Sequence, residues 1–215
     1  MLFNKYQYNQ FGINKRGYSQ SSLAFNEEGK EFWVKWILGI DKNDTKAKIL
    51  ADKLRHLQKA RHSALPEIIE YGYDEEQNAF AIVYELLEEV ETFETKVFEL
   101  KTQGAISGLL DLADCLKELH LKFKINHGDI HPANILIDKN GQFYLVDFGL
   151  ADITKTLSQT KELEIFARGF AAPEKLNKLV KGFPFQADIF SIGKVVEWFF
   201  DERQMELAEE YAFQL

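Results

Sequence analysis

Two short motifs stand on either side of a predicted hairpin, and this arrangement constrains the fold more than any other feature of the sequence. Residues 127–134 read His-Gly-Asp-Ile-His-Pro-Ala-Asn, and residues 147–149 read Asp-Phe-Gly. Between them, Asn140 and Gly141 separate two short apolar runs. An Asn-Gly pair in this setting is typical of a tight β-hairpin in which both turn residues take a positive φ. The spacing therefore predicts that the two motifs converge beside one hairpin.

The hydrophobic pattern changes along the chain from strand-like to helical. The first 40 residues are rich in aromatic and β-branched residues, and residues 5–11 and 30–37 read as strands around a Gly/Ser/Asn-rich stretch. The apolar run at residues 79–84 suits a buried strand. Apolar residues spaced three and four apart predict helices over residues 44–60 and 105–120.

These elements predict an α+β chain with two lobes. The 215 residues suffice for one large domain or for two small lobes. Strands crowd the first third of the sequence, while helices and the hairpin fill the remainder. We therefore expect a first lobe over residues 1–88, a second lobe over residues 89–215 and a hinge near residues 85–92.

The composition is that of a globular protein with a core, and it excludes several classes of function. The 26 Lys and Arg residues against 34 Asp and Glu give a net charge of −8, which argues against nucleic-acid binding. No apolar run approaches the roughly 20 residues of a membrane-spanning helix, and the N-terminus lacks the pattern of a signal peptide. Cys115 is the only cysteine, which excludes an internal disulfide and a multi-cysteine metal site. We expect a cytoplasmic protein without membrane insertion.

The two motifs contain the residue types that phosphoryl transfer requires. The phosphates of a nucleotide bind Mg²⁺, which takes carboxylate and amide oxygens as ligands. Asn134 and Asp147 offer these two groups. The acceptor hydroxyl needs a further carboxylate that orients it and accepts its proton, and Asp129 is the candidate.

Four motifs in this order resemble those of the eukaryotic-type protein kinase superfamily, over roughly residues 5–200. Besides the two motifs above, the sequence has Ala-Pro-Glu at residues 172–174 and Asp-Ile-Phe-Ser-Ile-Gly at residues 188–193. The resemblance implies a bilobal α+β fold with a small antiparallel β-rich N-lobe and a mainly helical C-lobe. Fewer residues follow the Ala-Pro-Glu motif than is usual in the family, so we expect the C-lobe to be truncated.

The resemblance assigns roles to residues of the second lobe. Asp129 corresponds to the catalytic base, and Asn134 and Asp147 correspond to the Mg²⁺ ligands. His131 stands where Ser/Thr protein kinases commonly have lysine. It is a candidate to donate to the transferring phosphate or to orient Asp129, and a purely structural role is the alternative. The first residue of the 188–193 motif is expected to brace the catalytic loop.

The resemblance also implies ATP and Mg²⁺ as cofactors, with the nucleotide held by the first lobe. Lys35 stands where the family has the lysine that holds the α- and β-phosphates; the alternative is an edge-strand lysine that points to solvent. Gly12, Asn14 and Gly17 occupy the positions of the glycine-rich phosphate loop, with Asn14 in place of the middle glycine. An ordinary hairpin turn is the alternative for these three residues.

Two further features of the family concern the hinge and the first helix. Backbone groups of Glu85 and Leu87 are expected to meet adenine. The helix over residues 44–60 should carry an acid that pairs with Lys35, and Asp52 is the only acid near the expected position. Asp52 lies almost opposite the apolar face of this helix, so a pair with Lys35 and a solvated position both remain open.

Three functions remain open. A Ser/Thr protein kinase is favoured by the motifs at residues 172–174 and 188–193, which small-molecule phosphotransferases usually lack. The catalytic-loop motif is similar to that of aminoglycoside and choline phosphotransferases, which favours a small-molecule kinase. Asn14 and the absence of a clear helix acid favour a pseudokinase or regulatory binding module. A protein substrate or regulatory partner is expected at the activation segment and at an exposed apolar face formed by residues 195–200.

Overall fold

The structure, a computed structural model, describes residues 1–9, 14–16, 19–148, 169–176 and 184–212. The chain divides into two compact units. The first contains Met1–Arg61 and Pro66–Glu88, and the second contains His62–Leu65, Glu89–Phe148 and the described residues from 169 onward.

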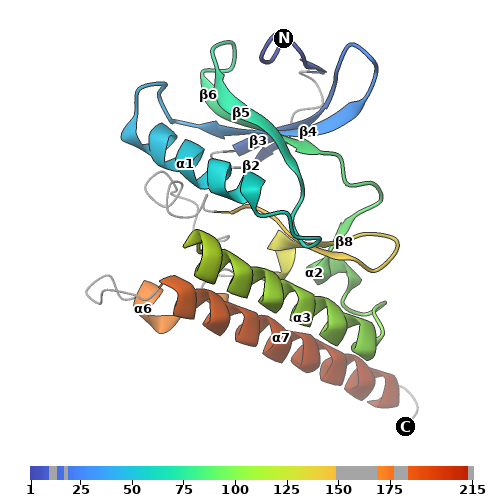
Figure 1. Ribbon diagram of the computed structural model, residues 1–215. Helices are drawn as coiled ribbons and strands as arrows, with labels where there is room; N and C mark the ends of the chain where they lie inside the picture. Colours follow the sequence, from blue (N-terminus) through green and yellow to red (C-terminus); the bar gives the residue numbers. More distant parts are fainter. Residues whose placement is uncertain (10–13, 17–18, 149–168, 177–183, 213–215) are drawn as a thin grey trace. The chain divides into compact units, whose positions relative to one another are not determined.

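The first unit is built on an antiparallel sheet (Figure 1). Its strands are β1 (Gln7–Tyr8), β2 (Asn14–Arg16), β3 (Ser19–Phe25), β4 (Glu31–Leu38), β5 (Ile68–Asp74) and β6 (Ala79–Glu85). Their order in the sheet is β1-β3-β4-β6-β5, and β2 pairs with β3. All these pairings are antiparallel. Strand β4 therefore lies in the interior of the sheet, between β3 and β6.

The first residues of the chain cover one face of this sheet. Side chains alternate between the two faces along a strand. Phe32, Val34 and Trp36 of β4 are buried on this face together with Leu2 and Tyr6. The Tyr6 ring lies edge-on to the Phe32 ring, with 5.1 Å between the ring centroids. Each large apolar side chain buried here contributes roughly 1.5–3 kcal/mol, so the N-terminal segment is an integral part of the unit.

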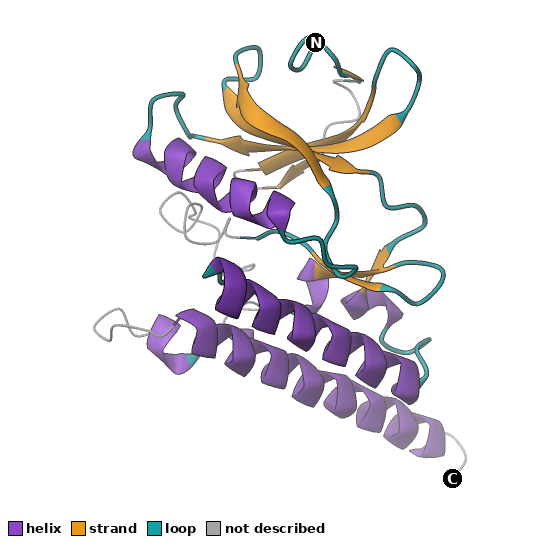
Figure 2. Ribbon diagram, viewed as in Figure 1, coloured by secondary structure: helices purple, strands orange, loops and turns teal. Residues whose placement is uncertain are grey.

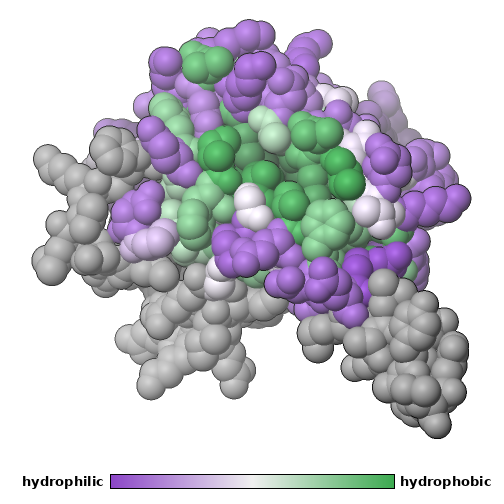
Figure 3. Space-filling view, turned by 90° about the horizontal axis from the view of Figure 1, so that it is seen from below, coloured by the Kyte–Doolittle hydropathy of each residue, from purple (hydrophilic) through white to green (hydrophobic). Residues whose placement is uncertain are grey.

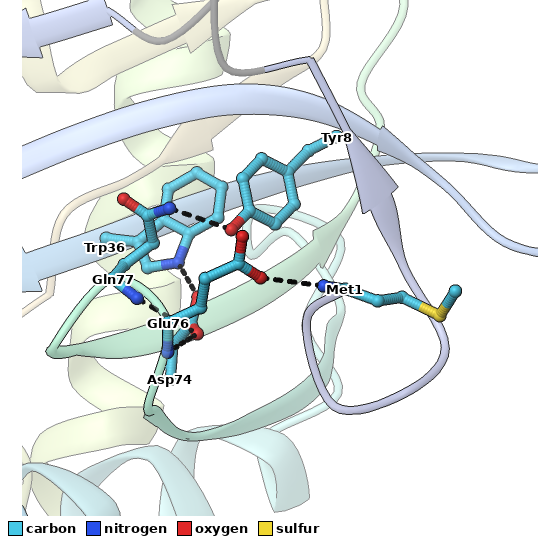
Figure 4. Close-up of polar contacts among 6 residues, drawn as sticks. All are labelled: Met1, Tyr8, Trp36, Asp74, Glu76 and Gln77. Atoms are coloured by element: carbon cyan, nitrogen blue, oxygen red, sulfur yellow. Dashed lines mark hydrogen bonds and ion pairs between the residues drawn. The ribbon is translucent and has the colours of Figure 1, made fainter.

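A polar network ties the turn between β5 and β6 to the same segment (Figure 4). The buried carboxylate of Asp74 accepts a 2.7 Å hydrogen bond from Nε1 of Trp36, and it also accepts one from the backbone N–H of Glu76 at 3.0 Å. The side-chain amide of Gln77 donates to the Tyr8 hydroxyl at 3.0 Å, and the N-terminal amine pairs with the Glu76 carboxylate at 2.8 Å. The two bonds from Trp36 and Glu76 satisfy the buried Asp74 carboxylate, which would otherwise be costly to take out of water.

Helix α1 (Thr45–Lys59) packs on the sheet from the other side (Figure 1). It begins after Asp44, whose carboxylate accepts a hydrogen bond from the backbone N–H of Lys46 at 2.9 Å and thereby caps the helix. Its buried side chains are spaced three and four residues apart and form one stripe: Ala47, Leu50, Leu54 and Leu57. The helix predicted over residues 44–60 is therefore confirmed.

Strand β3 lies in the stretch that the sequence pattern assigned to a connection between two strands. Its two fully buried positions hold Ser22 and Ala24. Because both side chains are small, β3 lacks the alternation of large apolar and polar residues that marks a half-buried strand. Of the strand predicted over residues 5–11, the described part contains β1, and residues 10 and 11 lie outside the described residues. The residues before β1 form a turn in which the Tyr6 N–H donates to the Leu2 carbonyl oxygen at 3.0 Å.

The second unit is mainly helical (Figure 2), with a small three-stranded sheet. Its helices are α2 (Phe93–Lys96), α3 (Thr102–Glu118), α6 (Pro173–Leu176) and α7 (Pro184–Ala212), with a π-helical turn η2 (Leu119–Phe123) and a 3₁₀ turn η3 (Pro132–Asn134). The strands β7 (Glu91–Thr92), β8 (Ile135–Ile137) and β9 (Phe143–Leu145) pair in that order. No helix in the described part of the chain is long and apolar enough to cross a membrane.

Helices α3 and α7 lie side by side and run antiparallel (Figures 1 and 2). Nε2 of His120, just beyond α3, lies 2.9 Å from Oδ2 of Asp188 near the start of α7. Farther along α7, the guanidinium of Arg203 donates to the carbonyl oxygen of Phe98, which precedes α3, at 2.7 Å. These two contacts fix the direction and the pairing of the helices.

Aromatic rings form the centre of the second unit's core. The Phe93 ring centroid lies 5.5 Å from that of Phe143 and 5.6 Å from those of Trp198 and Phe199. Phe199 is completely buried. The expectation of a contiguous exposed face at residues 195–200 is therefore wrong, because consecutive residues of a helix point in different directions and part of this stretch turns inward.

The predicted hairpin forms, but with a different turn. Strands β8 and β9 pair antiparallel. Gly141 has a φ of 81°, whereas Asn140 does not take a positive φ, contrary to the expectation for an Asn-Gly turn. The carboxylate of Asp138 accepts hydrogen bonds from the backbone N–H groups of Asn140 and Gln142, both at 2.9 Å. This side-chain bonding favours a longer turn that starts at Asp138.

Gly108 allows α3 to lie close to β9, and we expect its replacement to be destabilising. A Cβ atom at this position would lie 2.3 Å from Cδ2 of the Phe143 ring. Gly108→Ala is therefore expected to lower the free energy of unfolding by about 1–3 kcal/mol, because the core must shift to admit the methyl group. Urea denaturation measures this difference.

Gly104, one turn earlier in α3, supplies the matched control. A Cβ atom there meets no other atom within 4 Å. Gly104→Ala is expected to raise the free energy of unfolding by up to about 1 kcal/mol, since alanine favours the helix and glycine does not. If Gly108→Ala were as stable as Gly104→Ala, the close approach of α3 and β9 would be contradicted.

Candidate active site

Asp188 of α7 anchors the start of the segment 127–134. Its side chain is 1% exposed. One carboxylate oxygen accepts the backbone N–H of Gly128 at 2.8 Å, and the other accepts the backbone N–H of His127 at 2.7 Å and Nε2 of His120 at 2.9 Å. Hydrogen bonds to an ionised acceptor are stronger than neutral ones. The expectation that Asp188 braces this loop is confirmed.

The glycine at position 128 has a conformational reason. Gly128 has a φ of 87°, in the left-handed region that favours glycine. Both its N–H and that of His127 point to the same carboxylate. Glycine at this position therefore suits the turn that directs both N–H groups to Asp188.

His127 links the loop to the segment that precedes Asp147. Its ring is buried, and Nδ1 accepts the backbone N–H of Asp129 at 3.1 Å while Nε2 donates to the carbonyl oxygen of Val146 at 2.8 Å. These two partners assign the ring proton to Nε2. The ring also packs on Phe148, with 4.4 Å between the centroids. His127 therefore holds Asp129 and Asp147 in one frame.

Asn134 closes the same frame from the other side. Its side-chain Nδ2 donates to the carbonyl oxygen of Asp129 at 2.9 Å, and its backbone N–H donates to the carbonyl oxygen of His131 at 2.9 Å. Its own carbonyl oxygen accepts the N–H of Val146 at 3.1 Å. Because Nδ2 is bonded within the loop, Oδ1 is the side-chain atom that can bind a cation.

Asp147 follows β9 in an unusual backbone conformation. Its φ is 69°, in the left-handed region that few residues other than glycine adopt. Two hydrogen bonds hold the backbone before Asp147. The Val146 N–H donates to the carbonyl oxygen of Asn134 at 3.1 Å, and the Leu145 N–H donates to the carbonyl oxygen of Ala64 at 2.9 Å. Such a conformation persists only where the surroundings enforce it, and it is common at functional sites.

Asn134 and Asp147 fit the requirements of a Mg²⁺ site. A carboxylate and an amide oxygen are hard donors of the kind that Mg²⁺ takes, usually together with water and substrate phosphate. Soft metals would need thiolate or imidazole ligands instead. In the part of the chain that the structure describes, no cluster of three or more His, Cys, Asp or Glu residues is arranged to hold a metal.

Asp129 and His131 form the reactive side of the loop. Nε2 of His131 lies 3.8 Å from Oδ2 of Asp129. The Asp129 side chain is 31% exposed and that of His131 is 13% exposed. The Asp129 carboxylate is thus partly exposed to solvent, with its backbone fixed by His127 and Asn134. The arrangement can orient a hydroxyl and accept its proton.

Lys35 lies on an interior strand of the first unit. It is half-buried on β4, directly opposite Ser21 of β3 and Ile82 of β6. The alternative of an edge-strand lysine is therefore wrong, because strands pair on both sides of β4.

Asp52 lies on the exposed face of α1. It pairs with Arg55 at 2.9 Å, and its side chain is 62% exposed. The buried stripe of the same helix contains only apolar residues. Of the two alternatives left open by the sequence, the structure therefore favours a solvated acid.

Two further residues predicted to bind the nucleotide, Glu85 and Asn14, stand at the ends of strands. Glu85 ends β6, and its N–H donates to the carbonyl oxygen of Glu67 at 3.0 Å, while Leu87 lies half-buried two residues later. Asn14 begins β2, where it pairs with Ser21. Gly12 and Gly17 lie outside the described residues, and so does the side chain of Asn14.

The single cysteine lies apart from this chemistry. Cys115 of α3 is completely buried, and burial raises the pKa of its thiol to about 12. The thiol is therefore protonated at neutral pH and does not act as a nucleophile.

Comparison with known proteins decides the family. The protein kinase domain family matches residues 15–207, which is most of the chain. The chain belongs to the protein kinase family. The matched region of this kinase domain includes the catalytic loop, Asp147 and the bracing residue Asp188.

Curated relatives are protein kinases of different kinds. The chain is 33% identical to the dual specificity protein kinase zak2 of Dictyostelium discoideum over 149 residues, which are 65% of this chain and 22% of that protein. It is 38% identical to the serine/threonine-protein kinase CHK1 of Saccharomyces cerevisiae over 85 residues, 38% of this chain and 16% of that protein. The matched regions are thus about a fifth of these relatives' lengths.

A solved structure shows the same fold. The kinase domain of maize SIRK1 (sucrose-induced receptor kinase 1), crystallised with AMP-PNP, matches with a TM-score of 0.66 at 19% sequence identity. The match covers 87% of this chain and 66% of that one. It confirms the predicted α+β, kinase-like architecture with an antiparallel β-rich N-terminal part and a mainly helical remainder.

Proposed function

We propose that this kinase domain transfers the γ-phosphoryl group of ATP, bound with Mg²⁺, to a serine or threonine hydroxyl of a protein. The observation that carries this proposal is the single hydrogen-bonded frame that holds Asp129, Asn134 and Asp147. Phosphoryl transfer depends mainly on positioning and on neutralisation of charge. A rigid frame with one partly exposed carboxylate and two metal-ligand candidates suits both needs.

The nucleotide is assigned to residues of the first unit. Lys35 would hold the α- and β-phosphates, and backbone groups of Glu85 and Leu87 would bind adenine. The AMP-PNP in the maize kinase domain supports a bound nucleotide of this class. Asn134 and Asp147 would hold Mg²⁺, which supplies charge neutralisation at the phosphates when bound.

Asp129 would orient the acceptor hydroxyl and accept its proton. The carboxylate is partly exposed while its backbone is fixed on both sides, so it can meet a substrate without losing its position. His131 approaches the same carboxylate at 3.8 Å. This geometry favours a role for His131 in orienting Asp129 over direct contact with the phosphate.

A protein acceptor is supported by the relatives and by the Ala-Pro-Glu motif. Ala172 is buried, and Pro173 and Glu174 begin α6. The curated relatives carry names of protein kinases with serine/threonine or dual specificity. Serine and threonine are proposed as acceptors over tyrosine because the Ser/Thr relative matches the chain at 38% identity.

Transfer of radiolabelled γ-phosphate tests the proposal directly. The chain is incubated with labelled ATP and Mg²⁺, alone and with a generic protein substrate, and labelled amino acids are identified. Phosphoserine or phosphothreonine is the expected product. Label on an aminoglycoside, choline or a sugar, with none on protein, would replace the proposal by a small-molecule kinase. Nucleotide binding without transfer to any acceptor would replace it by a pseudokinase.

Asp147→Asn is expected to weaken nucleotide binding only when Mg²⁺ is present. The substitution removes a negative charge from the assigned ligand, so the affinity for MgATP should fall about tenfold or more, which corresponds to about 1.4 kcal/mol. Titration calorimetry with and without Mg²⁺ measures the difference. Asp114→Asn, at an exposed position on α3, is the control. Equal MgATP affinity of Asp147→Asn and wild type would remove Asp147 from the metal site.

A further inference from the structure

Trp33 of β4 is the most exposed of the chain's three tryptophans. Trp36 is 1% exposed and belongs to the core beneath the N-terminal segment. Trp198 is half-buried, and its ring lies edge-on to that of Phe93, with 5.6 Å between the centroids. Trp33, in contrast, is 37% exposed. Because tryptophan is largely buried on average, the exposed part of this indole is a candidate contact for a ligand.

Trp33 lies on the same face of the sheet as Lys35. Side chains alternate along a strand, and the neighbours of Trp33 in β4, Phe32 and Val34, are buried on the face that the N-terminal segment covers. Trp33 and Lys35 therefore occupy the opposite face. Along this face exposure increases from Ile37, which is completely buried, through the half-buried Lys35 to Trp33. Trp33 thus stands at the open end of the face.

Two further side chains border Trp33 across the sheet. Leu23 of β3 is directly opposite Trp33 on one side, and Tyr84 of β6 is directly opposite it on the other. Directly paired residues of antiparallel strands point to the same face, with Cβ atoms about 4.5–5.5 Å apart. Leu23 and Tyr84 are both half-buried. The three residues form a row with the exposed indole at its centre, and we call it the Trp33 row.

The Trp33 row lies between the two groups to which the nucleotide is assigned. Lys35 is two residues from Trp33 along β4, a distance of about 6.6 Å. A ribose separates the base of a nucleotide from its first phosphate by a distance of that order. At the other side, Tyr84 directly precedes Glu85, where β6 ends and the segment assigned to adenine begins. A nucleotide with its phosphates at Lys35 therefore brings its base to the Trp33 row.

Exposed apolar side chains also gather on the second unit, on the side that Figure 3 shows. Leu110 of α3 and Ile189 of α7 are each more than half exposed. These residues belong to a different unit from Lys35 and Glu85. Trp33 is the exposed apolar residue that shares both a strand and a face with the assigned phosphate ligand.

We propose that the base of the bound nucleotide stacks on the indole ring of Trp33. The inference rests on the proposed function, because it requires a nucleotide whose phosphates lie at Lys35 and whose base meets the backbone of Glu85 and Leu87. A flat aromatic ring offers a stacking surface to every base. The backbone groups then supply hydrogen bonds at the edge of the base, while Trp33 covers its face.

This ring is a property of the present chain and not of the kinase motif around the strand lysine. The motif reads Val-Ala-Ile-Lys in protein kinases. The same four positions, residues 32–35, read Phe-Trp-Val-Lys in this chain. Trp33 thus replaces an alanine, whose methyl group offers no ring to a base. Nucleotide affinity is therefore expected to depend on the side chain at position 33.

Titration calorimetry of the whole chain with MgATP tests the stacking. Trp33→Ala is expected to lower the affinity by at least about fivefold, the lower end of the range for removal of an aromatic ring from a base. Trp33→Phe keeps a smaller ring and should fall between Trp33→Ala and wild type. The control is Phe25→Ala, because Phe25 is 36% exposed at the end of β3, opposite Glu31 and farther from Lys35. Its affinity for MgATP should match that of wild type.

Each outcome of the titration decides between the inference and the proposed function. If wild type binds MgATP and Trp33→Ala binds it equally well, the inference is overturned and the proposed function stands. Tighter binding by Trp33→Ala would also overturn the inference, because the indole would then occupy the place of the base. Equal losses in Trp33→Ala and Phe25→Ala would do the same. A wild-type chain that binds no nucleotide would overturn the proposed function itself.

Tryptophan fluorescence locates the contact independently of the affinity. Stacking of a base on an exposed indole quenches its emission, so MgATP should reduce the fluorescence of wild type. Trp33→Phe retains Trp36 and Trp198, and MgATP should leave its fluorescence unchanged although it still binds. Circular dichroism and thermal melting verify that the variants are folded. A quench that persists in Trp33→Phe would show that the base does not stack on residue 33.

Discussion

Asp129→Asn is expected to reduce the rate of phosphoryl transfer by about 10²–10⁴-fold, the usual contribution of a general base, while the affinity for MgATP stays within about twofold. The asparagine side chain has nearly the same shape as aspartate, but it does not accept a proton from the substrate hydroxyl. The backbone bonds of residue 129 to His127 and Asn134 do not involve the carboxylate and should persist. The loop is therefore expected to keep its conformation.

Two measurements on the same preparation check this expectation. Initial rates with labelled ATP give the loss of transfer, and thermal shift with MgATP reports binding and folding together. Asp114→Asn again provides an exposed carboxylate control, for which the rate should not change. A variant Asp129→Asn that transfers phosphate at the wild-type rate would exclude Asp129 as the base. A variant that loses both transfer and binding would point to a misfolded loop, which the melting temperature would reveal.

The local part of the catalytic frame was predictable because it depends on short spacings. Asn134 follows Asp129 by five residues, and the 3₁₀ turn between them brings the amide back to the Asp129 carbonyl at 2.9 Å. The hairpin that returns the chain to Asp147 was also predictable from its turn residues. Its actual turn was not, because the Asp138 side chain bonds to the turn backbone and competes with the Asn-Gly geometry.

The contacts that hold this frame rigid were harder to foresee. His127 reaches the carbonyl of Val146, 19 residues away, and His120 reaches Asp188, 68 residues away. A buried histidine that bonds to a distant partner leaves no periodic signal in the sequence. The loop motif drew attention to Asp129, whereas the structure shows that His127 and Asn134 fix its backbone, and that Asp188 holds the two residues before it.

Helical periodicity correctly indicated that Asp52 points away from the buried side of α1, whereas the family pattern alone would have suggested a pair with Lys35. The family suggests an acid on α1 that pairs with Lys35, but the spacing puts Asp52 opposite the buried stripe. The structure agrees with the spacing, since Asp52 is exposed and pairs with Arg55. At this residue, the helical spacing therefore predicted the structure better than the family pattern did.

Asp188→Ala is expected to lower the free energy of unfolding of the second unit by about 3 kcal/mol or more. The substitution leaves three buried donors without their acceptor: the N–H groups of His127 and Gly128, and Nε2 of His120. Each unsatisfied buried donor costs about 1–3 kcal/mol. Phosphoryl transfer should fall in parallel, since the backbone of Asp129 depends on the same segment.

Asp188→Asn serves as a control in which only part of the hydrogen bonding to residue 188 is lost. Its amide oxygen can still accept one or two of the three hydrogen bonds, so the loss of stability should be smaller than for Asp188→Ala. Urea denaturation of wild type and the two variants measures the order, and Asp114→Ala reports the effect of removing an exposed carboxylate. The expected order of stability is wild type, then Asp188→Asn, then Asp188→Ala. If Asp188→Ala matched wild type in stability and in transfer rate, the catalytic loop would have to hold its conformation without α7, and the brace inferred from these three hydrogen bonds would be wrong.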